Sequence, residues 1–354
     1  MSDELDKVRQ HVLRYGWNST CFQVVNPGIR HWWSKDGLGL VGFVISGRLA
    51  VVAGAPICPE ELLPSVLEEW SEFCRKSGWK SGYFGAEERL QNALKGSANH
   101  CQVVLGCQPE WSPLDLVKRF STIPSLRAQI NRARNKGLKV SEWDAEKAKS
   151  DPRLKGVLAA WLETRGLPTM RFLVEPDTLD NLEGRRIFVA EQGENVVAFL
   201  NLCPSPCRKG WLTEEFPRLP DAPNGTVESL LAIAARTVSD EDSQFFTMGI
   251  IPLLTSEEPK DEPRWLRPIR KWAQAHHTRF YNFRGLFEFK SKFRPTKWTP
   301  VLVIIEDRRF RLSHLRALVK AFTVIAPELA MVIGLGRAAR TEIGWLLRRS
   351  RKKR

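Results

Sequence analysis

The order in which strand-like and helix-like segments follow one another restricts the fold of this chain more than any other feature. Two apolar, β-rich runs, LGLVGFVIS and RLAVVAG, precede the helix-like PEELLPSVLEEWSEFCRKSG, and the strand-like SGYFGA follows it. The same β-β-α-β order returns in RRIFVAEQGENVVAFLNLCP, VESLLAIAARTVSD and QFFTMGIIPL. We therefore predict an α/β fold of two related lobes, each with a mixed sheet flanked by helices.

The length of the chain agrees with this doubling, because 354 residues suffice for about two domains of ~150 residues each. We predict a first lobe over 1–118, a second lobe over 119–312, and a basic helical tail over 313–354. The apolar part of the tail, 321–336, is shorter than the ~20 residues that span a bilayer. We expect it to form a buried or an interfacial helix.

The charge balance points to an anionic partner. The net charge is +14 and the pI is about 9.7, which favours nucleic acid or an anionic membrane surface. The terminal RRSRKKR is either solvated or in contact with anionic lipid. The seven cysteines include no CxxC pair and no zinc-site spacing, and we expect reduced thiols.

Motifs of several common enzyme classes are missing or misplaced. GLGLVG, 37–42, matches GxGxxG, but strand-like residues follow it where a dinucleotide site needs a helix, so we predict a glycine-bearing hairpin. His276 and His277 end an amphipathic helix, a position that the helix dipole favours, and no HExxH pattern accompanies them. The sequence has no P-loop and no GxSxG elbow. We predict no metal site.

Cations alternate with aromatic residues in the stretch YNFRGLFEFKSKFRPTKWTP. We predict a strand in which Lys290, Lys292 and Arg294 point to one side of the pleat, with Phe289 and Phe293 on the other. Such a strand suits a lipid phosphate or the 3′ end of a tRNA.

Two further segments carry candidate functional groups. The helix SLRAQINRARNKG has four cations suited to nucleic-acid phosphates, although the helix taken alone favours the interpretation of a solvated face. The segment GWLTEEFPRLPDAPNGTVESLL gathers acids around a turn at Asn224. Glu228 falls in the first turns of a helix, where it either serves the helix dipole or acts on a substrate.

Several of these segments together resemble the C-terminal catalytic region of phosphatidylglycerol lysyltransferases and their alanyl-transferring relatives. The resemblance lies in the order and spacing of SLRAQINRARNKGLKV, WLETRGLPTMRFLVEPD, APNGTVESLL, FTMGIIPL and YNFRGLFEFKSKFRPTKWTPVLVI, preceded by VVAGAPICPEELLPSVLEEWSEFCRKSGW. It covers roughly residues 20–310. It implies two tandem acetyltransferase-like (GNAT) lobes. The acyl-CoA loop Q/R-x-x-G-x-G/A is absent from a credible position, which fits an acyl donor other than CoA.

The resemblance also implies a function. The chain is expected to move a lysyl or alanyl group from aminoacyl-tRNA to a lipid headgroup hydroxyl, that of phosphatidylglycerol. The ester is already activated, so no cofactor is expected. The implied partners are aminoacyl-tRNA and an anionic phospholipid membrane surface. The implied location is peripheral, on the inner face of the cytoplasmic membrane. Many relatives carry a long multi-span membrane domain that this sequence lacks, so we expect the transferase step without a flippase.

Roles for individual residues follow from the resemblance. Lys290 is expected to contact the reacting phosphate or oxyanion, and Glu214 or Glu228 to serve as the base or to bind the ammonium group of the amino acid. The expected substrate-binding residues are Arg218, Asn224, Phe283, Arg284, Lys292 and Arg294. The residues expected to attract tRNA are Arg127, Arg132, Arg134 and Lys136.

One departure from the family pattern affects specificity. Where much-studied members read like D-L-M-R before the PNG turn, this chain has Glu214-Glu215-Phe216-Pro217 and then Arg218. Three alternatives therefore stay open. In the first, the same fold transfers the group to another acceptor, such as another lipid, a sterol-like alcohol or a peptide amine. In the second, the donor is acyl-CoA. In the third, the chain is a non-catalytic module that binds RNA or membrane.

Overall fold

The computed structural model describes residues 2–164, 171–252, 262–268, 270 and 283–323. Its strands are β1 (Arg30–Trp33), β2 (Leu40–Ser46), β3 (Leu49–Ala53), β4 (Lys80–Ala86), β5 (Cys101–Trp111), β6 (Leu138–Trp143), β7 (Arg186–Gln192), β8 (Asn195–Ser205), β9 (Gly210–Thr213), β10 (Phe245–Thr247), β11 (Ile251–Pro252) and β12 (Lys297–Ile305). Its α-helices are α1 (Ser2–Tyr15), α2 (Leu63–Lys76), α3 (Glu88–Ala93), α4 (Pro113–Thr122), α5 (Pro124–Asn135), α6 (Ala145–Ser150), α7 (Pro152–Glu163), α8 (Thr226–Asp240), α11 (Phe283–Ser291) and α12 (Leu312–Phe322). Short 3₁₀ turns are η1 (Cys21–Val25), η2 (Glu60–Leu62), η3 (Phe172–Val174) and η4 (Pro206–Arg208).

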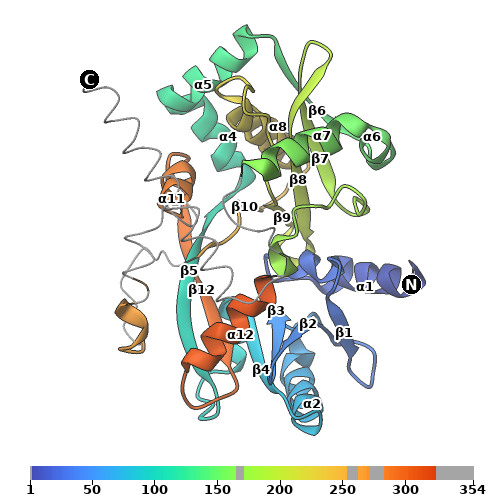
Figure 1. Ribbon diagram of the computed structural model, residues 1–354, viewed down its shortest axis with the longest axis vertical. Helices are drawn as coiled ribbons and strands as arrows, with labels where there is room; N and C mark the ends of the chain where they lie inside the picture. Colours follow the sequence, from blue (N-terminus) through green and yellow to red (C-terminus); the bar gives the residue numbers. More distant parts are fainter. Residues whose placement is uncertain (1, 165–170, 253–261, 269, 271–282, 324–354) are drawn as a thin grey trace, which may run out of the picture.

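One continuous sheet runs through both halves of the molecule (Figure 1). The strand order is β1-β2-β3-β4-β12-β5-β10-β9-β8-β7-β6, and β11 pairs with β5. The long strand β5 joins the halves, because it pairs with β12 over its whole length and with β10 at its end, where Trp111 lies opposite Phe246. The halves therefore share their central strands.

In the first half, alternate residues of β3 face two different helix layers. Ala50 and Val52 pack with α2, while Leu49 and Val51 pack with the cluster that contains α12 and η1. This is the period-2 alternation of a strand that is buried on both faces. The half is a sheet between α2 on one face and α1, η1 and α12 on the other.

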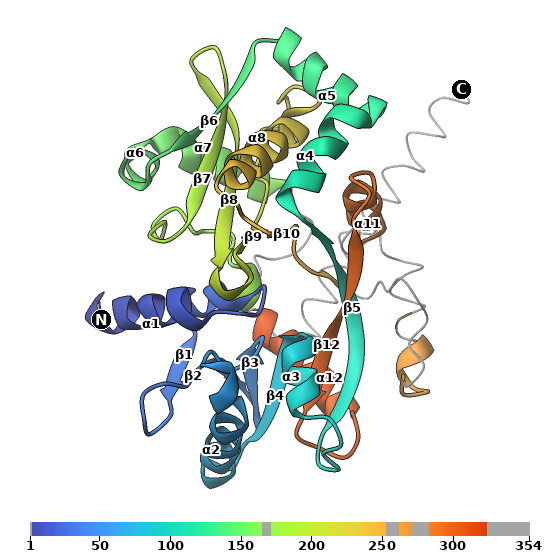
Figure 2. The same cartoon turned by 180° about the vertical axis from the view of Figure 1, so that it is seen from behind.

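The second half repeats this layering (Figure 2). Leu200 and Leu202 of β8 pack with α4, α5 and α8, and Phe199, which points to the other face of the sheet, packs with α6 and α7. The helix α8 crosses from β9 to the parallel strand β10, as α2 crosses from β3 to the parallel strand β4. The predicted β-β-α-β order is confirmed in the first half as β2-β3-α2-β4. In the second half the predicted hairpin is β7–β8, and the strand β9, which was not predicted, follows it, so the repeated order there is β8-β9-α8-β10.

The local predictions fare unequally. The stretch 37–42 lies in the turn and the second strand of the antiparallel β1–β2 pair, which confirms the hairpin interpretation. The strand predicted around Lys290 is wrong, because the chain is helical over Phe283–Ser291 and extended only from Lys297. The helix predicted to end at His276 and His277 falls largely outside the described residues, as does most of the segment 321–336.

The strand β12 lies in the sheet between β4 and β5 of the first half, although it comes from the segment assigned to the second lobe. Val303 and Ile305 of β12 have no exposed surface. The lobe boundary at 118 stays a prediction, and the topology adds that the first half is completed by residues from the C-terminal part of the chain.

Candidate functional site

The two parallel strands of the second half separate at their carboxyl ends. Beyond β9 the chain stays beside β8, since the amide of Glu214 donates to Asn201 O (3.0 Å) and that of Leu219 to Val197 O (2.9 Å). Beyond β10 the chain turns the other way, and Ile251 pairs with Cys107 of β5. The carboxyl ends of parallel strands are where α/β sheets commonly bind ligands.

The end of α11 fills this separation with the side chain of Lys290. Its Nζ donates to Met248 O (2.5 Å) and to Gly249 O (2.9 Å), and Lys290 is only 3% exposed. The loop that supplies the two carbonyls is itself held, because Gly249 N donates to the hydroxyl of Thr247 and that hydroxyl donates to Pro109 O. Gly249 has φ +74°, a conformation that glycine adopts without strain.

The burial of Lys290 changes its acid–base chemistry. Burial lowers the pKa of this amine to about 7, and the nearby negative charge of Glu215 opposes the shift. A neutral amine that donates both its N–H groups to the Met248 and Gly249 carbonyls keeps a lone pair, and the protonated amine keeps a third N–H. Lys290 can therefore accept and return a proton near neutral pH.

An ion pair lies two residues further along. Lys292 Nζ is 2.5 Å from Glu228 Oε1, and it also lies over the rings of Phe289 (4.0 Å to the centroid) and Phe293 (5.0 Å). Glu228 sits in the first turn of α8, where the helix dipole favours a carboxylate. The structure thus brings the predicted Glu228 and Lys292 into direct contact, across two elements far apart in sequence.

Aromatic rings enclose this pair. The ring of Phe289 lies 6.1 Å from that of Phe216 and 5.3 Å from that of Phe293, and Phe293 has no exposed surface. The pleat predicted to divide cations from rings does not exist here. Instead, the amine of Lys292 contacts the Glu228 carboxylate and also lies over the two phenylalanine rings. The end of α11 and the turn after it bring the cation and the rings together.

Glu214 is turned away from Lys290. Its carboxylate binds Arg185, with Oε2 3.0 Å from Nε, and accepts a bond from Gln23 Nε2 (3.3 Å). The Arg185 side chain is fully buried and also donates to Asn26 Oδ1 (2.8 Å). Burial alone lowers the pKa of Arg185, and the Glu214 carboxylate reverses this shift and leaves the pKa raised. Glu214 therefore joins the second half to η1 of the first.

Sequence reasoning missed the acid and the carbonyls nearest Lys290. Adjacent residues of an extended chain point in opposite directions, so the contact of Glu214 with Arg185 leaves Glu215 as the acid on the Lys290 side. The doubled glutamate was visible in the sequence, but nothing in it showed which carboxylate faces which way. Carbonyl groups leave no sequence signal, and only Gly249 marked the loop.

The remaining predicted substrate residues are more dispersed. Asn224 is exposed at the turn before α8, and Arg218 is exposed on the segment that bridges to Ala198 of β8. Arg294 is exposed in the turn after α11, with φ +49°. Phe283 and Arg284 begin α11, and their side chains are outside the described part. Within the described part of the chain, the hydrogen bonds of the Lys290 amine go to Met248 O and Gly249 O and not to Arg218, Asn224 or Arg294.

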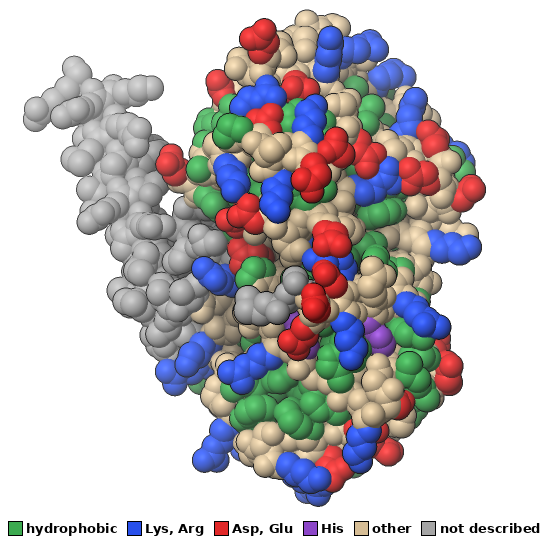
Figure 3. Space-filling model, turned by 90° about the vertical axis from the view of Figure 1, so that its right-hand side faces the viewer, with side chains coloured by type: hydrophobic (Ala, Val, Ile, Leu, Met, Phe, Trp, Pro, Cys, Tyr) green, Lys and Arg blue, Asp and Glu red, His purple; other side chains and the backbone are tan. Residues whose placement is uncertain are grey.

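The predicted basic helix is confirmed as α5. Its residues Arg127, Arg132 and Arg134, with Lys136 just beyond its end, are exposed on the upper part of the molecule (Figure 1). Arg127 donates to Ser121 O at 3.3 Å, so part of its side chain is engaged by the preceding helix. On the side of the molecule in Figure 3, by contrast, cations and acids are interspersed, which offers a polyanion no uniformly positive surface.

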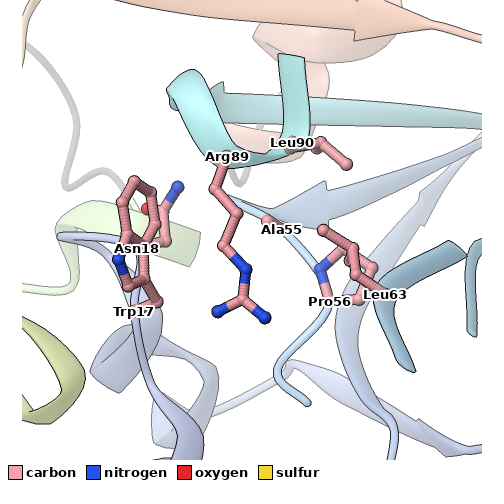
Figure 4. A pocket seen from close by; sticks show the side chains of 7 residues that line it. All are labelled: Trp17, Asn18, Ala55, Pro56, Leu63, Arg89 and Leu90. Atoms are coloured by element: carbon pink, nitrogen blue, oxygen red, sulfur yellow. The ribbon is translucent and has the colours of Figure 1, made fainter. Parts of the chain in front are cut away.

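A small hollow lies at the corresponding place in the first half (Figure 4). Its empty volume, open to solvent, is about 240 Å³, and it is lined by Trp17, Asn18, Ala55, Pro56, Leu63, Arg89 and Leu90. The guanidinium of Arg89 donates to Cys58 O (3.1 Å). The chain after β3 follows β2 here, with Ile57 bridged to Leu40, as the chain after β9 follows β8. None of the predicted site residues lines this hollow.

The doubled layering and the separated parallel strands define the class of this protein. It is an α/β protein with one large mixed sheet, in which both halves repeat the same strand–helix order, as predicted from the sequence. The chain belongs to the family of phosphatidylglycerol lysyltransferase C-terminal domains, whose model matches residues 9–305. The matched segment contains every residue of the Lys290 site.

Solved structures with the same fold include members of this family. The C-terminal domain of a putative lysylphosphatidylglycerol synthetase from Agrobacterium fabrum superposes with a TM-score of 0.75 at 21% identity, covering 90% of this chain and 96% of that one. The L-PGS structure from Bacillus licheniformis gives 0.75 at 21% identity, over 89% and 95% of the two chains. At this identity the likeness shows the fold.

A curated relative is an uncharacterized protein of Corynebacterium glutamicum, 22% identical over 280 residues. The alignment covers 76% of this chain and 35% of that protein, so the chain spans about a third of the length of the relative. Within the described ranges, no helix is both long enough and apolar enough to cross a membrane.

Proposed function

We propose that this protein transfers an aminoacyl group, lysyl or alanyl, from aminoacyl-tRNA to the headgroup hydroxyl of phosphatidylglycerol. The observation that carries the proposal is membership of the phosphatidylglycerol lysyltransferase family over 9–305. The acyl donor is an ester of the terminal ribose of tRNA, which is already activated. The protein then has to position two substrates, move one proton and stabilise one oxyanion.

Lys290 is the group that we propose for the proton transfer. As the hydroxyl oxygen of the lipid forms a bond to the ester carbonyl carbon, its proton passes to the neutral Lys290 amine. The bond between that carbon and the ribose oxygen then breaks, and the ribose oxygen takes the proton from the Lys290 ammonium. The pKa of Lys290, lowered to about 7 by burial, lets it act in both directions.

The neighbouring groups take supporting roles in this proposal. Lys292, paired with Glu228, offers a cation to the lipid phosphate beside the aromatic wall of Phe289. Glu215 and Glu228 are the acids on the Lys290 side of the segment and of α8, and we assign the ammonium group of the amino acid to them. Glu214 holds Arg185 and so positions the segment that carries Glu215. The cations of α5 attract the tRNA backbone.

The test is a transfer assay with purified protein. Lysyl-tRNA or alanyl-tRNA with a labelled amino acid is mixed with phosphatidylglycerol in detergent micelles, and extracted lipid is identified by mass spectrometry. We expect labelled phosphatidylglycerol, and no product after RNase digestion of the donor. Label on a peptide amine or another alcohol would indicate the alternative acceptors. Transfer from acyl-CoA, or none from any aminoacyl-tRNA, would overturn the proposal.

The role of Lys290 is tested separately in the same assay. Lys290→Met should lower the rate by about 100-fold or more, the usual value of a general base, while tRNA binding stays at the wild-type level. Lys139→Met, at an exposed lysine on β6, is the matched control and should keep the full rate. A Lys290→Met rate equal to wild type would remove Lys290 from the mechanism without removing the transferase function.

A further inference from the structure

The exposed side of α12 combines cations with apolar side chains. One face of the helix carries Leu312, Arg316, Val319 and Lys320. Arg316 is four residues from both Leu312 and Lys320 and three residues from Val319, and residues at these spacings lie on the same side of a helix. Leu312 is 62% exposed and Val319 is 40% exposed, although both are large apolar residues. The opposite face is buried, with Leu318 at 2% exposure.

The segment leading into α12 extends the cationic surface. Arg308, Arg309 and Arg311 are all exposed, and the sequence has no acidic residue from Arg308 to Thr323. Asp307, just before this segment, is 8% exposed at its side chain and pairs with Lys80 (2.5 Å) and more distantly with Arg311 (3.8 Å). We call the exposed residues 308, 309, 311, 312, 316, 319 and 320 the α12 surface.

We infer that the α12 surface docks the protein on an anionic phospholipid bilayer, with the arginines and Lys320 at the headgroups and Leu312 and Val319 inserted among them. Basic residues near an anionic membrane contribute about 1 kcal/mol each. Apolar side chains among them suit a lipid interface and not a nucleic-acid backbone. The basic helix α5 differs here, since none of the exposed large hydrophobic residues among the described ones belongs to it.

The far end of α12 leads toward the Lys290 site. The ring of Phe322 packs against Phe84 (4.8 Å) and Phe172 (5.2 Å). Leu173, which follows Phe172, and Ile250 both lie near Gly85. A Cβ added to Gly85 would be 3.9 Å from Leu173 and 3.5 Å from Ile250. Ile250 follows Gly249, whose carbonyl binds Lys290. The far end of α12 thus lies near the loop that carries the carbonyl partners of Lys290.

The α12 surface lies beyond the segment that the family model matches, which ends at residue 305. Family membership therefore does not assign it. The inference rests on the proposed function only for its choice of lipid, and it predicts membrane binding that is measurable without catalysis. In Figures 1 and 2, α5 lies in the upper part of the molecule and α12 in the lower part, which leaves room for tRNA and membrane at once.

The experiment measures sedimentation of the full chain with vesicles of phosphatidylcholine, with and without phosphatidylglycerol. Arg316→Glu/Lys320→Glu should weaken binding to the anionic vesicles by at least about tenfold. Lys139→Glu/Lys149→Glu makes the same charge change at exposed lysines of the second half and should stay within about twofold of wild type. Leu312→Ser/Val319→Ser should also weaken binding, with no change of charge.

A second pair, Arg308→Glu/Arg309→Glu, repeats the charge test outside the helix, so a folding defect in one variant does not decide the outcome. The inference would be overturned if wild type and both charge-reversed pairs bound vesicles equally. It would also be overturned if the charge-reversed pairs lost tRNA binding and kept vesicle binding. The α12 variants should still transfer to lipid in detergent micelles. Inactivity of every protein there, with vesicle binding as expected, would reject the proposed function and leave the docking surface standing.

Discussion

At the scale of single residues, the separated strand ends surround one lysine with carbonyls and apolar side chains in place of water. The amine of Lys290 is satisfied by Met248 O and Gly249 O, yet its charge has lost most of its hydration. A buried cation favours its neutral form unless a partner compensates. Glu215 compensates only in part, and this balance leaves the lowered pKa of Lys290 near neutrality.

The lowered pKa of Lys290 predicts a pH dependence of stability. Between about pH 7 and about pH 10 the amine is neutral in the folded state and protonated in the unfolded state, which has the ordinary lysine pKa. The unfolded state then binds more protons, so the free energy of unfolding rises with pH, by on the order of 1 kcal/mol per pH unit. Lys290→Met should lack this rise in urea unfolding from pH 7 to pH 9. Parallel pH profiles for the two proteins would show an ordinary lysine pKa.

The Glu214–Arg185 pair predicts a different kind of loss. Glu214→Gln leaves the buried Arg185 guanidinium without its counter-charge, and we expect the free energy of unfolding to fall by about 3 kcal/mol. Glu191→Gln, at a half-exposed acid on β7, should change it by less than about 1 kcal/mol. Urea unfolding measures both. A Glu214→Gln protein of full stability that has lost transfer activity would support a catalytic role for Glu214 instead.

At the scale of elements, α8 is held tightly against the basic helix α5. Gly225, which precedes α8, has φ +97°, and a Cβ there would lie 2.1 Å from Gln129 O of α5. That contact helps to position two helices with different proposed tasks, since Glu228 lies in the first turn of α8 and Arg132 and Arg134 lie on α5. Gly225 therefore allows the helix that carries Glu228 to approach the basic helix closely, and the core residues of both helices complete the contact.

A glycine pair tests this packing. Gly225→Ala should lower the free energy of unfolding by about 2 to 5 kcal/mol, from backbone strain and the clash with Gln129. Gly137→Ala is the matched control, because Gly137 has φ +82° with nothing within 4 Å of the added Cβ. It should cost only the strain, about 1–2 kcal/mol. Equal losses in urea unfolding would mean that α8 and α5 separate easily.

At the scale of the whole molecule, the halves are joined by shared strands and by buried charges. Arg208 of η4 in the second half binds Glu87 (2.8 Å) and Glu110 (3.0 Å) of the first. Burial raises the pKa of Glu87, and Arg208 opposes this shift. Together with Arg185 and Glu214 these groups bridge both sides of the junction, and β12 completes the sheet of the first half. Separate folding of the halves would expose all of them.

We therefore expect the fragment 1–118 to lack a stable fold. Without β12, the facing edges of β4 and β5 lose their common partner, and the buried side chains that pack on Val303 and Ile305 are exposed. The fragment should show no cooperative urea transition by circular dichroism, while the full chain unfolds in one. A cooperative transition in the isolated fragment would contradict this and show that the first half is independent of β12.

The sequence by itself determined the features that depend on local pattern. Strand alternation and helical spacing were enough for the doubled β-β-α-β order, the hairpin near Gly37 and the basic helix α5, because these periodicities lie within one element. The family resemblance rested on the same local segments. The wrong prediction of a strand around Lys290 also came from local pattern, because this segment fits both periodicities. The spacing of Phe283, Leu286 and Phe287 fits a helix, while that of Phe287 and Phe289 fits a strand.

Only the tertiary structure decided which groups meet. Lys290 is buried because segments from β10 and α11 close around it, and Glu214 is occupied because Arg185 comes from a different strand. The place of β12 depends on partners about 200 residues away in sequence. The burial of a side chain and the partner of a charge or strand depend on segments far away in the sequence. The residues next to such a group therefore do not reveal its pKa, its ion pair or its strand partner.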